Sequence, residues 1–188
     1  MKKIVVAILI AVIVVLSFSA LYLGLIQKPQ EVAPARRFTL TSEAFKDGSR
    51  IPIKYTCEGL DTSPPLSWKD YPPETKSFVL IVEDLDAPGG VFTHWLVYNI
   101  PPEVNSLEEG VKPVERLSSG IMQGINDFGR IGYGGPCPPP GKPHRYVFKL
   151  YALDITLDLK PGVSKKELLQ AMEGHILAEA TLTGIYSR

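Results

Sequence analysis

The side chains best suited to chemistry fall in two short stretches. Asp84 and Asp86 stand in the turn "DLDAPGG", and His94 follows near the beginning of the next apolar run. His144 and Tyr146 begin another such run. Imidazole and phenol groups donate hydrogen bonds to phosphate-like oxygens, and a carboxylate accepts them from an ammonium group. Aspartates near the histidines would also keep the imidazoles charged. These residue types suit a small anionic or zwitterionic ligand.

A stiff loop leads to the second histidine. Five prolines and three glycines lie between Gly134 and Pro143, and proline fixes φ near −65°. The loop therefore delivers His144 in few conformations, and its glycine N–H groups are further candidate donors for an anion.

Other interpretations of the same residues remain open. Asp86 suits a turn in which the carboxylate bonds nearby backbone N–H groups, which is the structural role that we favour for it. Two histidines with aspartates would also suit a divalent metal, although no ligand pair has helical spacing. Ser42, Ser63 and Ser67 lack the context of a nucleophile, and no cofactor motif is present. We expect a protein that binds its ligand and is not an enzyme.

Strand signals dominate the elements that must position these residues. Runs rich in β-branched and aromatic residues, bounded by proline, glycine and aspartate, predict strands at residues 36–42, 50–57, 77–84, 92–100, 144–154 and 176–187. Ser164 and Glu167 form a capping box that predicts a helix ending near Gly174. The class is mainly β.

The N-terminus reads as a membrane segment. Residues 4–26 form an uncharged apolar run that is long enough for one transmembrane helix. Lys2 and Lys3 ahead of this run favour a cytoplasmic N-terminus. We predict a signal anchor at residues 1–27, or alternatively a cleaved signal peptide, then a linker at 28–35 and one domain at 36–188. The domain would be extracytoplasmic, either held at the cell membrane or secreted.

Charge and cysteine content limit the partners. Residues 36–188 carry 17 Lys and Arg against 19 Asp and Glu, so the domain has no basic footprint for nucleic acid. Cys57 and Cys137 lie in loops, without the spacing of a zinc or redox motif. Outside the cytoplasm we expect them to form a disulfide.

Several motifs together resemble the phosphatidylethanolamine-binding protein family. They are "DLDAP", "HWLVYNIP" and "GGPCPPPGKPHRYVFKLYALD", and the stretches "KYTCEGLDTSPPLSW" and "GHILAEATLTGIYSR" resemble its bacterial and archaeal, Raf-kinase-inhibitor-like branch. The resemblance covers about residues 37–188. It implies an antiparallel β-sandwich with a short C-terminal helix region and a pocket for phosphate-type anions. Matched position by position, it implies ligand-binding roles for these residues: Asp84, His94, Gly135, Pro136, His144 and Tyr146.

Three functions follow as hypotheses. The first is a membrane-tethered module that binds a small phosphate-type or zwitterionic ligand without covalent chemistry. The second is an inhibitor of extracytoplasmic serine proteases, an activity that the resemblance also implies. The third is metal-dependent hydrolysis, which would require the two histidines and a bound metal. An extracytoplasmic location argues against the control of cytoplasmic kinases.

Overall fold

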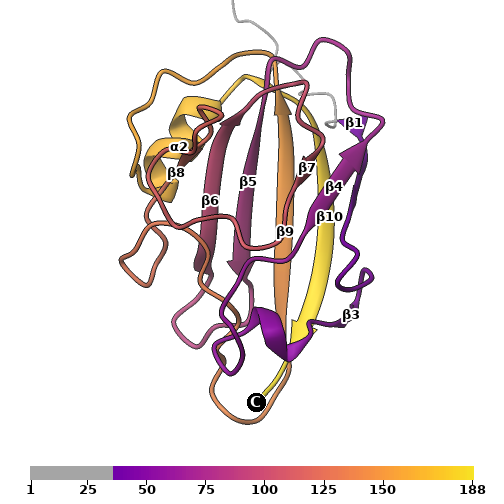
Figure 1. Cartoon of the computed structure of the whole chain (residues 1–188), viewed down its shortest axis with the longest axis vertical. Coiled ribbons are helices and arrows are strands. Elements are labelled where there is room, and N and C mark those ends of the chain that lie inside the picture. The colour runs from indigo at the N-terminus through magenta and orange to yellow at the C-terminus, as the bar shows by residue number, and fades with distance from the viewer. Residues whose placement is uncertain (1–35) are drawn as a thin grey trace, which may run out of the picture. The chain divides into compact units, whose positions relative to one another are not determined.

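The computed structural model describes residues 36–188, which form a mainly β domain (Figure 1). In chain order the elements are β1 (Arg36–Arg37), β2 (Thr39–Thr41), β3 (Ser49–Arg50), the 3-10 helix η1 (Ile53–Tyr55), β4 (Leu66–Lys69), β5 (Ser77–Asp84), β6 (Phe92–Ile100), β7 (Ser106–Leu107), β8 (Met122–Gln123), β9 (His144–Leu153), α2 (Lys165–Met172) and β10 (Ile176–Tyr186). The long strands agree with the runs that the sequence predicts.

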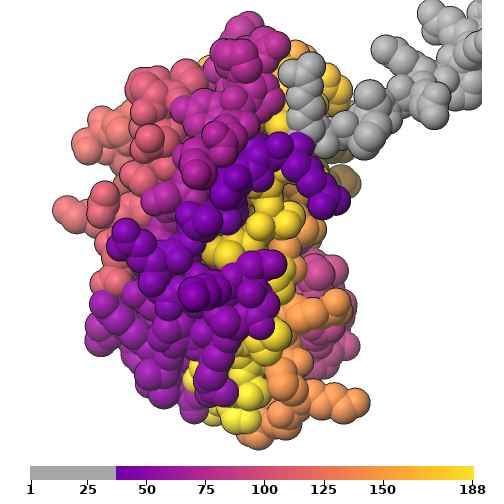
Figure 2. Space-filling view, turned by 90° about the vertical axis from the view of Figure 1, so that its right-hand side faces the viewer, coloured from indigo at the N-terminus to yellow at the C-terminus, as the bar shows by residue number. Residues whose placement is uncertain are grey.

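A large sheet forms the centre of the domain. Its strand order is β1-β10-β9-β5-β6-β8, and β3 also pairs with β10. The four long strands β10, β9, β5 and β6 are antiparallel to one another, whereas the short strands β1 and β3 run parallel to β10. Figure 2 shows β10, in yellow, between the indigo N-terminal segments and the orange residues of the β9 region.

A second sheet completes the sandwich. It has the order β2-β4-β7 and is antiparallel throughout. Leu40, Leu66 and Trp68 from this sheet are buried in one cluster with Phe78 and Leu80 of β5. Because strand side chains alternate between faces, β5 gives this core every second residue.

The opposite face of the large sheet is covered by α2. Leu168 and Met172 of the helix are buried with Val79, Ile81 and Leu96 of the sheet. Every residue of β5 is therefore buried, as in sheets that are covered on both faces. Ser164 and Glu167 make the predicted capping box at the start of α2. The helix precedes β10, so the described chain ends with a strand.

Two predicted elements need correction. Residues 50–57 do not form one strand, because Pro52 has no N–H to donate and the Tyr55 N–H donates to its carbonyl, which starts η1. The prediction of an N-terminal transmembrane helix is unsupported: within residues 36–188 no helix is long and apolar enough to cross a membrane. Residues 1–27, to which that prediction applied, and residues 28–35 lie outside the described residues.

Candidate functional site

The candidate site lies at one end of the large sheet, where β5 ends and both β6 and β9 begin. Asp84, the last residue of β5, pairs with Phe92 of β6 on one side and with Tyr146 of β9 on the other. His144 is the first residue of β9 and lies opposite Tyr186 of β10. Strand pairing thus brings together the two stretches singled out in the sequence.

His144 and Asp84 form a buried hydrogen-bonded pair. His144 Nδ1 lies 2.7 Å from Asp84 Oδ2, and the two side chains are only 10% and 5% exposed. The other oxygen of Asp84 accepts the Asp86 N–H at 2.9 Å. An ionised carboxylate can only accept, so Nδ1 of His144 carries a hydrogen and its Nε2 is left for a ligand.

His94 is held differently. Its Nδ1 lies 2.6 Å from the carbonyl oxygen of Gly134, which fixes the hydrogen on Nδ1. Burial lowers the pKa of His94, and the Gly134 carbonyl and the nearby carboxylates only partly oppose that effect. The expectation that both histidines are held charged is therefore wrong for His94.

Tyr146 lies behind the two imidazoles. Its ring packs edge-on against His94 and stacks beside His144. Its hydroxyl is buried and finds no hydrogen-bond partner among residues 36–188. Burial, reinforced by the negative charge of Asp84, raises the pKa of Tyr146, so the hydroxyl keeps its proton. Tyr146 is not among the residues that line the pocket, so its part in the site is to pack against the two imidazoles.

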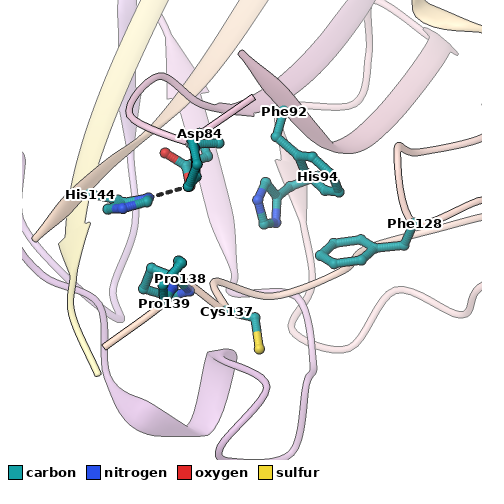
Figure 3. Close-up of a pocket in the computed structure, with 10 residues that line it drawn as sticks. Asp84, Phe92, His94, Phe128, Cys137, Pro138, Pro139 and His144 are labelled. Atoms are coloured by element: carbon teal, nitrogen blue, oxygen red, sulfur yellow. Dashed lines mark hydrogen bonds and ion pairs between the residues drawn. The ribbon is translucent and has the colours of Figure 1, made fainter. Parts of the chain in front are cut away.

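A pocket of about 190 Å³ opens beside these groups (Figure 3). Its walls are formed by Asp84, Ala87, Pro88, Phe92, His94, Phe128, Cys137, Pro138, Pro139 and His144. Figure 3 shows the two imidazoles on either side of Asp84, with Phe92 and Phe128 beyond His94. Apart from the three ionisable groups, the wall is apolar or sulfur-containing, which suits a small ligand with some apolar surface.

Phe128 is a wall residue that the sequence interpretation missed. It lies in the loop "NDFGRIG", where Asn126 Oδ1 accepts the N–H groups of Phe128 and Arg130. The Phe128 ring contacts both Phe92 and His94 edge-on. The only sequence signal for this wall residue is an apolar side chain in a turn with glycines. Nothing in the local sequence indicates that the turn folds over His94.

Two glycines of the stiff loop, Gly134 and Gly135, have backbone N–H groups that are already hydrogen-bonded within the protein. Gly134 N–H donates to the His94 carbonyl and Gly135 N–H to Asp61 Oδ1, so neither is free for an anion. A Cβ on Gly135 would lie 2.5 Å from the Tyr55 carbonyl oxygen, which excludes larger residues. Gly135 and Pro136 are buried just behind the wall and do not line the pocket.

The same loop is tied to the segment after η1. Cys57 and Cys137 form a disulfide, and the Cys57 N–H donates to the Pro136 carbonyl. Asp61 adds its bond to Gly135 and an ion pair with Arg130. Sequence analysis gave no role to Asp61, which acts only through residues far away in the chain.

Asp86 lies outside the pocket. Both of its oxygens bind Arg145, at 2.7 and 2.8 Å from the guanidinium nitrogens, and one also accepts the Arg145 N–H. These hydrogen bonds lower the pKa of Asp86 to about 2. Asp86 thus has a structural role, but it secures the beginning of β9 through a distant residue and does not bond the nearby backbone N–H groups expected from the sequence.

Metal binding finds no support in this geometry. Within residues 36–188 no three His, Cys, Asp or Glu side chains gather as ligands for one ion. Asp84 is occupied by His144 and by the backbone of Asp86.

Fold and site together define a β-sandwich domain with a small pocket at the end of its large sheet. Residues 41–187 match the sequence profile of the phosphatidylethanolamine-binding protein family. The chain therefore belongs to this family.

Two relatives match this chain over most of their own length. A UPF0098 protein of Methanothermobacter thermautotrophicus is 56% identical over 149 residues, which are 79% of this chain and 98% of the relative. Another from Aquifex aeolicus is 54% identical over 78% of this chain and 86% of its own.

Solved structures agree with the fold. A phosphatidylethanolamine-binding protein homologue from Chlamydia trachomatis superimposes with a TM-score of 0.74 at 48% identity, covering 82% of this chain and 99% of its own. Escherichia coli YbcL, described as a member of the mammalian family, gives a TM-score of 0.74 at 37% identity, with 81% and 99% covered.

Proposed function

We propose that this domain binds a small phosphate-type anion or zwitterion in the Asp84 pocket and performs no covalent chemistry on it. The observation that carries the proposal is the pair of unused ring nitrogens in the pocket wall beside Asp84, Nε2 of His144 and Nε2 of His94. Buried polar groups are normally hydrogen-bonded, so such a grouping supports a ligand. A protonated His144 donates from Nε2 to an oxyanion while Asp84 balances its charge.

Calorimetric titration with phosphate and phosphoethanolamine tests this function. We expect the full chain to bind at least one of them, and His144→Ala to weaken binding by about tenfold or more, the usual loss for a hydrogen bond with a charged partner. His175→Ala is the matched control, because His175 also pairs with an aspartate, Asp154, at 2.8 Å but lies at the other end of β9 and β10. Absence of binding, or equal losses in the two variants, would contradict the proposal.

Serine protease inhibition is a second candidate. It is favoured by the exposed loop that follows the disulfide, in which Pro139, Pro140, Gly141, Lys142 and Pro143 stay accessible. A rigid loop that presents a lysine loses little entropy when an enzyme cleft binds it. A panel of trypsin-like proteases distinguishes the two functions, since Lys142→Ala would abolish inhibition and leave phosphate binding intact.

We also propose that the domain works in an oxidising compartment. Disulfides persist in such compartments, which is what the Cys57–Cys137 bond supports. Alkylation of thiols in intact cells, followed by mass spectrometry, should find both cysteines unmodified before reduction. Free thiols at both positions would place the domain in a reducing compartment.

A further inference from the structure

The pocket has an unusual charge balance for an anion site. Its wall includes no lysine and no arginine, and its ionisable side chains are Asp84, His94 and His144. With Asp84 ionised and His94 neutral, a protonated His144 brings the sum only to zero. An anion that enters this pocket finds no excess positive charge.

His94 presents a hydrogen-bond acceptor to the pocket. Its Nδ1 hydrogen is committed to the Gly134 carbonyl, so in the neutral ring Nε2 holds a lone pair. Within residues 36–188 Nε2 has no hydrogen-bond partner, and the ring lines the pocket. The side chain that the sequence suggests as an anion donor is therefore placed as an acceptor.

The surroundings of His94 favour the neutral ring. Three aromatic rings enclose it edge-on, from Phe92, Phe128 and Tyr146, and the residue is only 3% exposed. Asp84, Asp127 and Asp61 favour its protonation, but burial outweighs them and lowers its pKa. The remaining ionisable groups nearby are His144, which pairs with Asp84, and Arg130, which lies over the Phe128 ring.

An oxyanion without a proton fits this arrangement poorly. Sulfate or a phosphodiester would oppose its oxygens to the His94 lone pair and to the carboxylate of Asp84, whose two oxygens already accept hydrogen bonds. A buried acceptor that finds no donor in the complex loses its bonds to water without replacement, and this desolvation penalty weakens binding. A ligand that carries its own acidic hydrogen removes that conflict.

We propose that the pocket selects oxyanions that retain an acidic hydrogen, and that a singly protonated phosphate monoester donates this hydrogen to Nε2 of His94. A charged oxygen of the ligand then accepts from Nε2 of protonated His144. This inference rests on the proposed function and narrows it, because it favours a phosphate monoester over the phosphodiester of an intact phospholipid headgroup.

Methyl phosphate and dimethyl phosphate make a matched pair of probes. At pH 6 about half of a phosphate monoester is singly protonated, and this form has the same charge as the diester but also a P–OH group. We expect the full chain to bind this form of methyl phosphate at least tenfold more tightly than dimethyl phosphate or sulfate. Similar affinities for the three anions would overturn the inference alone, whereas no binding of any would overturn the proposed function as well.

Proton uptake and a variant give independent readouts. Calorimetry at pH 7.5 in two buffers of different ionisation enthalpy should show that methyl phosphate takes up a proton on binding, since its dianion predominates there. His94→Phe keeps an aromatic ring in the enclosure and removes Nε2, so methyl phosphate should lose about tenfold in affinity, whereas dimethyl phosphate, which no longer meets the opposing lone pair, should bind more tightly than to wild type. Binding without proton uptake, or equal losses for both probes, would contradict the role given to His94.

Discussion

Glu83 and Asp84 are neighbours on β5, and their carboxylates lie on opposite faces of the large sheet. Glu83 binds Lys149 of β9 at 2.7 Å and Lys165 of α2 at 2.8 Å. Burial opposes the ionisation of Glu83, but the hydrogen bonds and charges of the two lysines outweigh it and lower its pKa. Asp84, by contrast, has a single histidine and faces a pocket.

Two adjacent carboxylates thus have different roles: Glu83 stabilises the fold, and Asp84 belongs to the proposed binding site. The negative charge of Glu83 is paired with two lysines, and its bond to Lys165 connects α2 to the sheet. The Asp84 cluster leaves two ring nitrogens unused, which costs stability unless a ligand satisfies them. Such incompletely satisfied polar groups are expected where a protein binds something.

Removal of the disulfide should have the largest effect on stability. It tests whether this bond keeps the pocket wall around Cys137 in place. Cys57 and Cys137 are 80 residues apart, and in the chain-entropy model such a loop contributes about 4 kcal/mol to the free energy of unfolding. We expect the Cys57→Ser, Cys137→Ser double variant to lose about that much in urea unfolding and to bind phosphate more weakly. Wild-type protein under reductant is the control. Unchanged stability in both would mean that hydrogen bonds alone hold this wall.

Paired substitution at Glu83 and Asp84 tests the comparison most directly. Glu83→Gln should lower the free energy of unfolding by about 1–2 kcal/mol, less than for a fully buried pair because both lysines reach solvent. Phosphate binding should not change in this variant. Asp84→Asn should weaken phosphate binding by about tenfold. The comparison fails if the two variants show the same pattern in denaturation and calorimetry.

The pH dependence of stability sharpens the description of His94. A lowered folded-state pKa means that the unfolded chain binds more protons below its own pKa near 6.5. Stability should be complete above that pH and fall as the pH drops through 6.5 towards the folded-state pKa. Thermal denaturation between pH 5 and 8, without phosphate, should show a shallower decline for His94→Gln than for wild type. Parallel curves would imply that His94 is not buried in its neutral form.

Asp86→Asn should have the smallest effect. The Asp86–Arg145 pair is accessible, with side chains 30% and 59% exposed, and such pairs contribute little. We expect the Tm to fall by about 2 °C or less at neutral pH, with phosphate affinity unchanged. With a pKa of about 2, Asp86 should lose its contribution only as the pH falls from about 4 to 2. A clear loss of phosphate binding would extend the site beyond the pocket.

Local patterns explain why much of the fold was predictable. The apolar runs that became β5, β6, β9 and β10 need only neighbouring residues to be recognised, and the Ser164 capping box is complete within four positions. Residues 50–57 misled because β-branched residues surround Pro52, whose missing N–H decides the local structure. The parallel pairing of β1 and β3 with β10 depends on long-range contacts.

By itself the sequence determined the class of fold, the family and three residues of the pocket wall, Asp84, His94 and His144, since these depend on residue type and spacing. Other wall residues, such as Phe128, came only from the structure. Tertiary structure decided how those residues act. Gly134, forty residues from His94, fixes the imidazole tautomer through its carbonyl oxygen. Aromatic rings from three segments bury the imidazole and so disfavour its protonated form. Asp61 takes the Gly135 N–H that an anion would have used. Hydrogen-bond partners and dielectric surroundings come from distant parts of the chain, so residue type alone does not specify the donor or acceptor role of His94.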